Sequence, residues 1–277
     1  MHRCGDFLEM PLVYAIAIDK YTRSRTNTNP LDITDAYTLY CATKTWKTLR
    51  GVKSLIDRHF GEDALSLVRS CYENYLNQIF ALVNEEKLAK LILARAGLSD
   101  GCFRYAVSKN GRLDRRKIID LSTGQEIEND ISTSTMASWS PYEEDADIHS
   151  SLYSFLSRYT HPHILAIHHY LDTSGFRATG RDMCLETIFY GTFVGALGLD
   201  ALSALPQIPN QLRKDINFFL KRPRSSVLKF VQLNKKENSY GDLFRGIVER
   251  TKHFEKPWPV WAYNKSLNST NHAPSDR

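Results

Sequence analysis

The sequence lacks most of the short motifs by which enzyme classes are recognised. It contains no P-loop and no dinucleotide-binding GxGxxG, so nucleotide-driven chemistry has no support. An HExxH metal motif is also absent. His163 and His168 are five positions apart, whereas residues on one helical face are three or four apart. We therefore expect neither a metal nor a cofactor.

Cysteine is scarce and shows no zinc-type spacing. The chain has five cysteines and no CxxC: Cys4, Cys41, Cys71, Cys102 and Cys184. This odd, widely spaced set favours reduced thiols in a cytoplasmic protein. Asp6 and Glu9 precede the apolar run 11–18, which therefore lacks the basic start of a signal peptide. Export is not expected.

Linkers and internal repeats are missing as well. No Gly/Ser-rich or Pro-rich linker divides the 277 residues, and no segment recurs at a fixed period. With 42% hydrophobic residues, the chain can bury one large core. We predict a single helical domain over residues 1–263. Residues 264–277 are polar and are predicted to form a disordered tail.

The first part of the chain has apolar residues at helical spacing. One amphipathic helix is expected over residues 35–60, where Gly61 stops it, and the next carries its inward stripe over 65–82. A third helix is expected to begin at Asn84 as its N-cap and to end where Gly97 turns left-handed. The pattern predicts an all-α fold, a multi-helix bundle.

Residues 99–140 interrupt the helical pattern as a loop-rich insertion. Glycines and a Ser/Thr-rich run over 132–138 break the periodicity. Residues 103–107 and 117–121 alternate like short strands, which can pair as a small β-hairpin.

Helical spacing returns over residues 148–159. Pro162 interrupts that helix and can open a new one that runs to Gly175. Further helices are expected over 210–220 and 225–233. Trp258 and Trp261 are expected to dock the end of the chain on the bundle.

Residues 187–199 are uncharged but too short to span a membrane, so we expect a buried core helix and no membrane partner. Gly191, Gly195 and Gly198 leave one side of it without bulk. A neighbouring helix can therefore approach closely.

Basic residues outnumber acidic ones between Arg213 and Lys256, although the whole chain has a net charge of only +5. Such a bias can meet phosphates. A solvated surface balanced by acidic residues elsewhere explains it equally simply, and we favour that interpretation.

Two groups of polar residues are candidates for chemistry. Ser66, Arg69, Glu73 and Asn77 follow a spacing of three or four residues and share one helical face. The alternative is an ordinary Arg/Glu ion pair on a solvated face, which stabilises a helix by only a few tenths of a kcal/mol.

The second group precedes Pro162. Tyr153, Ser157 and His161 are four residues apart, and Arg158 lies one turn before His161 and His163. A helix that starts at Pro162 would offer free N–H groups to a phosphate, and Arg158 would add donors. Alternatively, a hydrogen-bonded histidine simply holds a Pro-kinked corner.

These two blocks, LVRSCYENYLN (67–77) and YSFLSRYTHP (153–162), resemble an uncharacterised bacterial helical family, a domain of unknown function. Its pattern joins an Arg-x3-Glu helix to a Tyr-x3-Ser-x3-His-Pro helix end. The resemblance implies that five side chains gather in one place: Arg69, Glu73, Tyr153, Ser157 and His161.

A looser resemblance concerns Arg158 and His163, which fit the Arg-x4-His spacing of HEPN helical domains. Many HEPN proteins are similar to metal-independent ribonucleases of toxin or antiphage systems, whose cleft is shared by two protomers. This resemblance implies RNA as substrate, a homodimer, and a partner or antitoxin protein that restrains the activity.

Two functions follow as hypotheses. In a ribonuclease, His161 or His163 would act as base, and Arg158 would clamp the phosphate together with Arg69, oriented by Glu73. In a non-enzymatic binding or regulatory module, the same residues would form a structural polar network. Binding of a small phosphorylated ligand at Pro162 is compatible with either.

Overall fold

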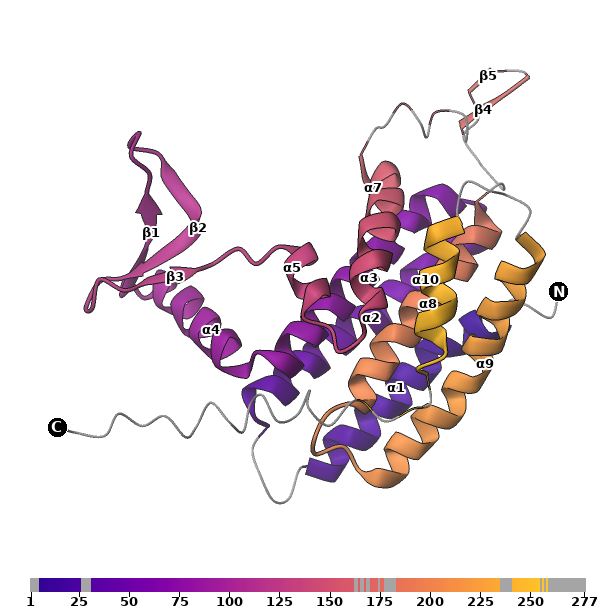
Figure 1. Cartoon of the computed structure of the whole chain (residues 1–277), viewed down its shortest axis with the longest axis horizontal. Coiled ribbons are helices and arrows are strands. Elements are labelled where there is room, and N and C mark those ends of the chain that lie inside the picture. The colour runs from indigo at the N-terminus through magenta and orange to yellow at the C-terminus, as the bar shows by residue number, and fades with distance from the viewer. Residues whose placement is uncertain are drawn as a thin grey trace.

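The computed structural model describes residues 5–25, 31–161, 183–234 and 241–254. It also describes residues 164, 167, 170–173, 175, 176, 256 and 258. The long helices are α1 (Gly5–Arg25), α2 (Ile33–Asp57), α3 (Gly61–Val83), α4 (Glu85–Ser99), α8 (Cys184–Ser203), α9 (Asn210–Asn234) and α10 (Gly241–Thr251). All of these except α4 gather into one bundle (Figure 1). The predicted all-α fold with a short β insertion is confirmed.

Helix α8 is the centre of the bundle and contacts α1, α2, α3 and α9. It is the only described helix long and apolar enough to cross a membrane, and 83% of its apolar window is buried inside the protein. The expected core helix over 187–199 is confirmed. Its glycines receive α1: a Cβ on Gly191 would lie 2.7 Å from the ring of Phe7, and one on Gly198 would lie 2.2 Å from the hydroxyl of Tyr14.

The corner between α2 and α3 differs in detail from expectation. Helix α2 ends at Asp57, and the left-handed residue that turns the chain is His59, with φ 65°. Gly61 does not stop α2; it is the first residue of α3. It is needed there because a Cβ would lie 2.5 Å from the backbone nitrogen of Cys184, at the start of α8.

Helix α4 and a three-stranded antiparallel sheet, which the insertion contributes, form an arm. Its strands are β1 (Phe103–Val107), β2 (Leu113–Asp120) and β3 (Glu126–Glu128), in that order. The bounds of β1 are as predicted, whereas β2 is longer than 117–121 and β3 was not predicted. The sheet packs on α4 and stands apart from the bundle (Figure 1).

A broken helix follows the arm and runs along α3. It comprises α5 (Thr133–Ser138), α6 (Glu144–Ile148), the π-helical turn η1 (His149–Tyr153) and α7 (Ser154–Thr160). Asp145 contacts Tyr75, and Tyr153 contacts Arg69, so this segment is antiparallel to α3. The Ser/Thr-rich run expected as loop is helix α5, because Ser132 caps it by accepting from the amide of Thr135.

Three further expectations are wrong. Gly97 does not end α4, which continues to Ser99; instead Gly97 leaves room for the ring of Phe103, and Gly101 takes the left-handed conformation. The separate helices over 210–220 and 225–233 are one helix, α9, which contains Pro223. The helix expected to reach Gly175 gives way to a strand pair, β4 (Leu171–Asp172) with β5 (Gly175–Phe176).

The end of the chain docks as expected, since Trp258 is buried with 3% of its surface exposed. Trp261 and the predicted tail 264–277 lie outside the described residues. Four of the five cysteines are described, and three of these are free thiols: Cys41, Cys71 and Cys102.

Replacing Gly61 by Ala should destabilise the protein by about 2 kcal/mol, because a methyl group would meet the backbone of α8, which no side-chain rotation can relieve. Gly51→Ala is the matched control: its Cβ would lie 3.2 Å from a flexible Leu67 methyl, and alanine favours the helix. Urea unfolding would compare the two. Equal stability of both variants would contradict the close contact at Gly61.

Candidate functional site

A polar cluster joins α3 to the π-helical turn. Nε of Arg69 donates to Oε1 of Glu73 at 3.1 Å, and its Nη2 donates to the hydroxyl of Tyr153 at 2.6 Å. The Tyr153 hydroxyl in turn donates to Glu73 at 3.2 Å, and the Arg69 guanidinium lies 4.6 Å from the centre of the Tyr153 ring. The structure therefore brings together three of the predicted site residues in a closed network.

Asn77 and Ser157, two other predicted residues, are hydrogen-bonded next to this cluster. Asn77 donates its amide to the carbonyl of Glu73 at 2.8 Å and accepts from the hydroxyl of Tyr37 at 3.0 Å. Ser157 donates its hydroxyl to the carbonyl of Tyr153 at 2.6 Å, one turn earlier in the same helix. Both side chains thus support the helix backbone next to the cluster.

His149 is the histidine that touches this cluster, and sequence reasoning missed it. Its ring centre lies 4.8 Å from that of Tyr153 and 5.9 Å from that of Tyr72. Nε2 lies 3.4 Å from the Thr133 hydroxyl, while Nδ1 is buried without a partner among the described residues. Burial lowers the pKa of His149. The four-residue interval from His149 to Tyr153 was the only available signal.

Two further predicted residues, Arg158 and His161, lie at the far end of α7. Arg158 is half-buried in its last turn, and His161 is exposed just after it, in an extended conformation with φ −127° and ψ 149°. His163 lies outside the described residues. Because a helix rises about 1.5 Å per residue, His161 is about 12 Å along the axis from Tyr153. The expected gathering of all five residues is therefore only partial.

One short sequence motif matches a catalytic pattern by spacing alone. Residues 97–101 read GLSDG, which fits the GxSxG pattern of nucleophile elbows. An elbow requires a strand followed by a helix, whereas here Ser99 is the last residue of α4 and β1 follows it. The spacing is therefore coincidental.

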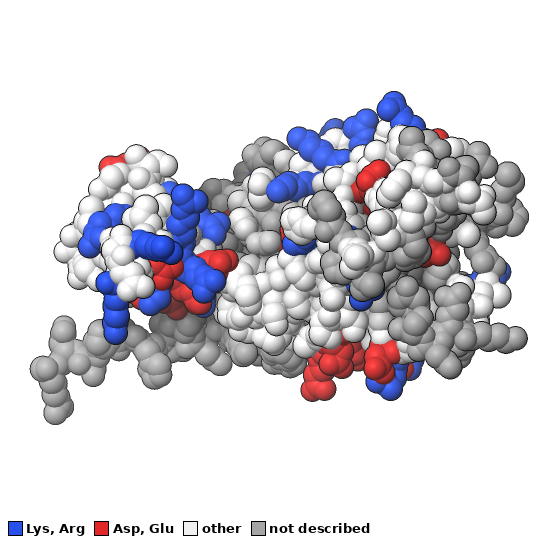
Figure 2. Space-filling model, turned by 90° about the horizontal axis from the view of Figure 1, so that it is seen from above, with Lys and Arg blue, Asp and Glu red and all other residues white. Residues whose placement is uncertain are grey.

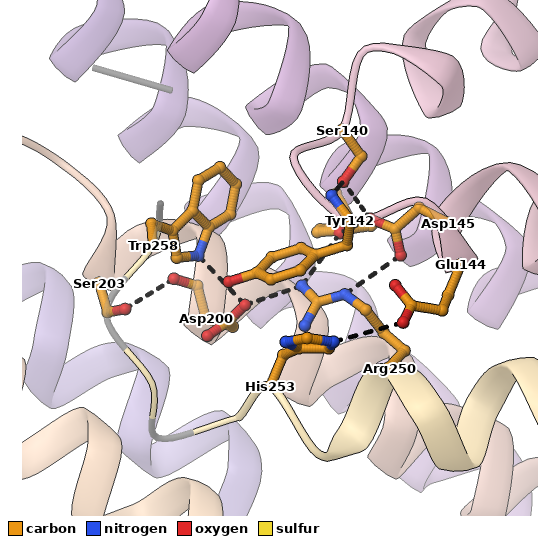
Figure 3. Close-up of polar contacts among 10 residues, drawn as sticks. Ser140, Tyr142, Glu144, Asp145, Asp200, Ser203, Arg250, His253 and Trp258 are labelled. Carbon is orange, nitrogen blue, oxygen red and sulfur yellow. Dashed lines mark hydrogen bonds and ion pairs between the residues drawn. The ribbon is translucent and has the colours of Figure 1, made fainter. Parts of the chain in front are cut away.

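A second polar network is fully buried at the heart of the bundle (Figure 3). Arg250, on α10, donates to Asp145 at 3.2 Å and to Asp200, on α8, at 2.8 Å. The hydroxyl of Tyr75, on α3, donates to Asp145. Trp258 donates to Asp200 at 3.2 Å. The network thus links four helices and the docked end of the chain.

Burial determines the electrostatics of this network. Arg250 has no exposed surface, and its guanidinium lies 3.8 Å from the centre of the Tyr142 ring. Burial raises the pKa of Asp200, against the opposing pull of Arg250. For Arg250 burial alone would lower the pKa, but Tyr75, Asp145 and Asp200 outweigh it and the pKa is raised. No substrate can reach these groups, so we assign them a structural role.

Among the residues that the structure describes, no group of three His, Cys, Asp or Glu side chains is placed to hold a metal ion. The cluster at Arg69 is an arginine, a carboxylate and a phenol. Such groups bind and orient phosphates or hold helices in register.

Together these features define a mainly helical protein with a small β-sheet arm and a polar cluster between α3 and its antiparallel neighbour. A family model, Family of unknown function (DUF5677), matches residues 35–178, just over half of the chain. The chain belongs to this family. The match spans Arg69 to His161 and ends before Asp200 and Arg250. Comparisons with curated proteins and with solved structures gave no match.

The buried His149 should make stability depend on pH. Because its folded-state pKa is lowered, the unfolded chain takes up a proton first as pH falls below about 6.5, so stability is lost towards acid pH. His149→Phe keeps the stacking and should reduce that loss. Urea unfolding at pH 7 and pH 5 would measure it, with the exposed His59→Asn as control. An unchanged acid loss in His149→Phe would contradict the assignment.

Arg250→Met should cost about 3 to 5 kcal/mol, because it leaves two buried carboxylates without their cation. Arg245→Met, on the same helix, breaks only an exposed pair with Asp242 and should cost less than about 1 kcal/mol. Denaturant unfolding of both variants tests this difference. A loss for Arg250→Met no larger than for Arg245→Met would show that the network is not an anchor.

Proposed function

We propose that this protein cleaves RNA without a metal ion, at the exposed end of α7, with His161 as base and Arg158 as phosphate-binding group. The observation that carries the proposal is the placement of an exposed imidazole one turn after a half-buried arginine. Such a pair can take the ribose 2′-hydroxyl proton and stabilise charge on the phosphate. The 2′-oxygen then attacks phosphorus, and the bond to the 5′-oxygen breaks as that oxygen gains a proton.

The cluster at Arg69 takes a supporting part in this proposal. Two donors of Arg69 are already directed to Glu73 and Tyr153, and the cluster lies about 12 Å along the helix from His161. Arg69, Glu73 and Tyr153 therefore act as positioning residues that fix α7 on α3. A direct phosphate clamp by Arg69 fits this geometry less well.

The same proposal includes a cellular location and a biological role. The free thiols of Cys41, Cys71 and Cys102 fit the cytoplasm. A toxin or antiphage role, with a homodimer and a restraining partner protein, is what the HEPN resemblance of Arg158 and His163 implies. In a dimer, a second copy of the α7 end would supply further cations to the same RNA.

A non-enzymatic binding or regulatory module is the second candidate, and one observation favours it. The Arg69, Glu73 and Tyr153 side chains satisfy one another, as a register-fixing network would. In that case the protein would bind without cutting.

Cleavage of total cellular RNA in EDTA tests the proposal. Wild type should yield fragments with 2′,3′-cyclic phosphate ends, and His161→Ala should reduce the rate about 100-fold or more, as expected for loss of a general base. Arg158→Gln should also slow cutting, and His163→Ala would locate the base if His161→Ala stays active. Thermal unfolding should show little change for His161→Ala, because its side chain is exposed.

Lys90→Gln, which changes an exposed residue of α4, serves as the control and should cut like wild type. Cutting that EDTA abolishes would overturn the mechanism. No cutting by any form would favour the binding module.

A further inference from the structure

The hairpin of β1 and β2 carries an unusual concentration of positive charge. Residues 104–117 contain six basic residues and one acidic residue, Asp114. Their excess equals the net charge of +5 of the whole chain. All six basic side chains are exposed: Arg104, Lys109, Arg112, Arg115, Arg116 and Lys117.

Most of these cations have no acidic partner. Lys117 pairs with Glu126, on β3, but no ion pair joins any of the other five to another residue that the structure describes. The nearby acidic groups are engaged elsewhere: Asp114 accepts from the backbone amide of Arg116, Asp120 accepts from Ser122, and Glu128 pairs with Lys87. The positive charge of the hairpin is therefore open to solvent.

The basic segment from Arg213 to Lys256 behaves differently. Arg222 pairs with Glu9, Arg245 with Asp242, and Lys252 with Glu249. Arg213 donates to the carbonyls of Ser203 and Leu205, and Arg250 is buried. Several basic residues of this segment thus make ion pairs or hydrogen bonds within the bundle. On the arm, by contrast, five of the six cations have no ion pair with a described residue.

The shape of this surface indicates what it can bind. On the hairpin, Arg104 lies opposite Ile119. Because a strand rises about 3.3 Å per residue, the cations from Arg112 to the level of Ile119 extend over about 23 Å. Blue side chains gather over the lobe that holds the sheet, which stands away from the rest of the molecule (Figure 2). Charges spread along a ribbon do not converge on one small anion. They match a polymer with a phosphate at each repeat.

We propose that the β1–β2 hairpin is an RNA-binding arm that holds the phosphate backbone of single-stranded RNA. The proposal rests on the proposed function only for the choice of RNA as the polyanion. Val107 and Leu113, which pair across the strands, are 51% and 63% exposed and can contact sugars or bases between phosphate contacts. Binding is electrostatic and independent of sequence, and it serves a long RNA better than a short one.

Two triple variants with the same loss of charge test the arm. The arm variant replaces three hairpin cations: Lys109→Gln, Arg112→Gln and Arg115→Gln. The control variant replaces three exposed lysines of α9: Lys214→Gln, Lys221→Gln and Lys229→Gln. Neither set is buried, so both proteins should unfold at the wild-type temperature.

Fluorescence anisotropy would measure binding of a labelled 20-nucleotide RNA at several salt concentrations, with His161→Ala added to all three proteins so that the RNA stays uncut. The arm variant should bind at least tenfold more weakly at low salt, and its plot of log affinity against log salt should be shallower by about 2, since each phosphate contact on a single strand contributes about 0.7. The control variant should stay within about twofold of wild type.

Equal weakening in both variants, or none in the arm variant, would overturn the proposal. Vesicles of anionic lipid address the other polyanion: a loss of vesicle binding with unchanged RNA binding would assign the arm to a membrane and overturn it too. The two proposals fail separately. RNA binding that depends on the arm without cleavage would remove only the ribonuclease, and cleavage of long RNA at the wild-type rate by the arm variant would remove only the arm.

Discussion

The fold depends on one buried cation. Arg250 donates to both Asp145 and Asp200, which come from segments 105 and 50 positions earlier in the chain. Without Arg250 both carboxylates would lie in the core without a cation, and an unpaired buried charge costs several kcal/mol. The apolar helix α8, the segment that carries α6 and the last helix α10 are therefore stabilised together. The polar cluster at Arg69 lies on the same pair of elements, α3 and its antiparallel neighbour.

The two polar clusters of the protein have different roles. Around Arg250 all polar atoms lie in the core, where they set the packing of helices. Around Arg69 the side chains are partly exposed, 17% for Arg69 and 35% for Glu73. Of the first cluster, Tyr75, Tyr142 and Asp145 lie within the residues that the family model covers, whereas Asp200, Arg250 and Trp258 lie beyond them. The family segment thus supplies one carboxylate of an anchor whose cation comes from a later helix.

Much of the architecture could be predicted because it follows from the local periodicity of apolar residues in the sequence. The inward stripes of α2 and α3 repeat every three or four residues, and the alternation of residues 103–107 identifies β1. The pairing of Arg69 with Glu73 follows from a spacing of four. Tyr153 was placed beside them only through the family resemblance, because no local signal relates positions 84 residues apart.

Other features could not be predicted for the same reason. In the sequence, Arg250 is indistinguishable from an ordinary exposed basic residue of an amphipathic helix. Its burial follows only from its partners on α6 and α8. His149 precedes the segment 153–162 in which candidate residues were sought. Only its ring contacts with Tyr72 and Tyr153 place it at the cluster. The helix α5 was missed because serine and threonine indicate loops unless one of them caps a helix, as Ser132 does.

The π-helical turn sets the phase of the segment that carries the candidate site. Asp145, His149 and Tyr153 all face α3 although they are four residues apart, an interval that advances an α-helix by about 40° beyond a full turn. The wider turn over residues 149–153 absorbs that drift. Removing one residue there would rotate everything downstream by about 100° and direct Arg158 and His161 to another side of the molecule. The length of this turn is therefore under as strict a constraint as the identity of any side chain in it.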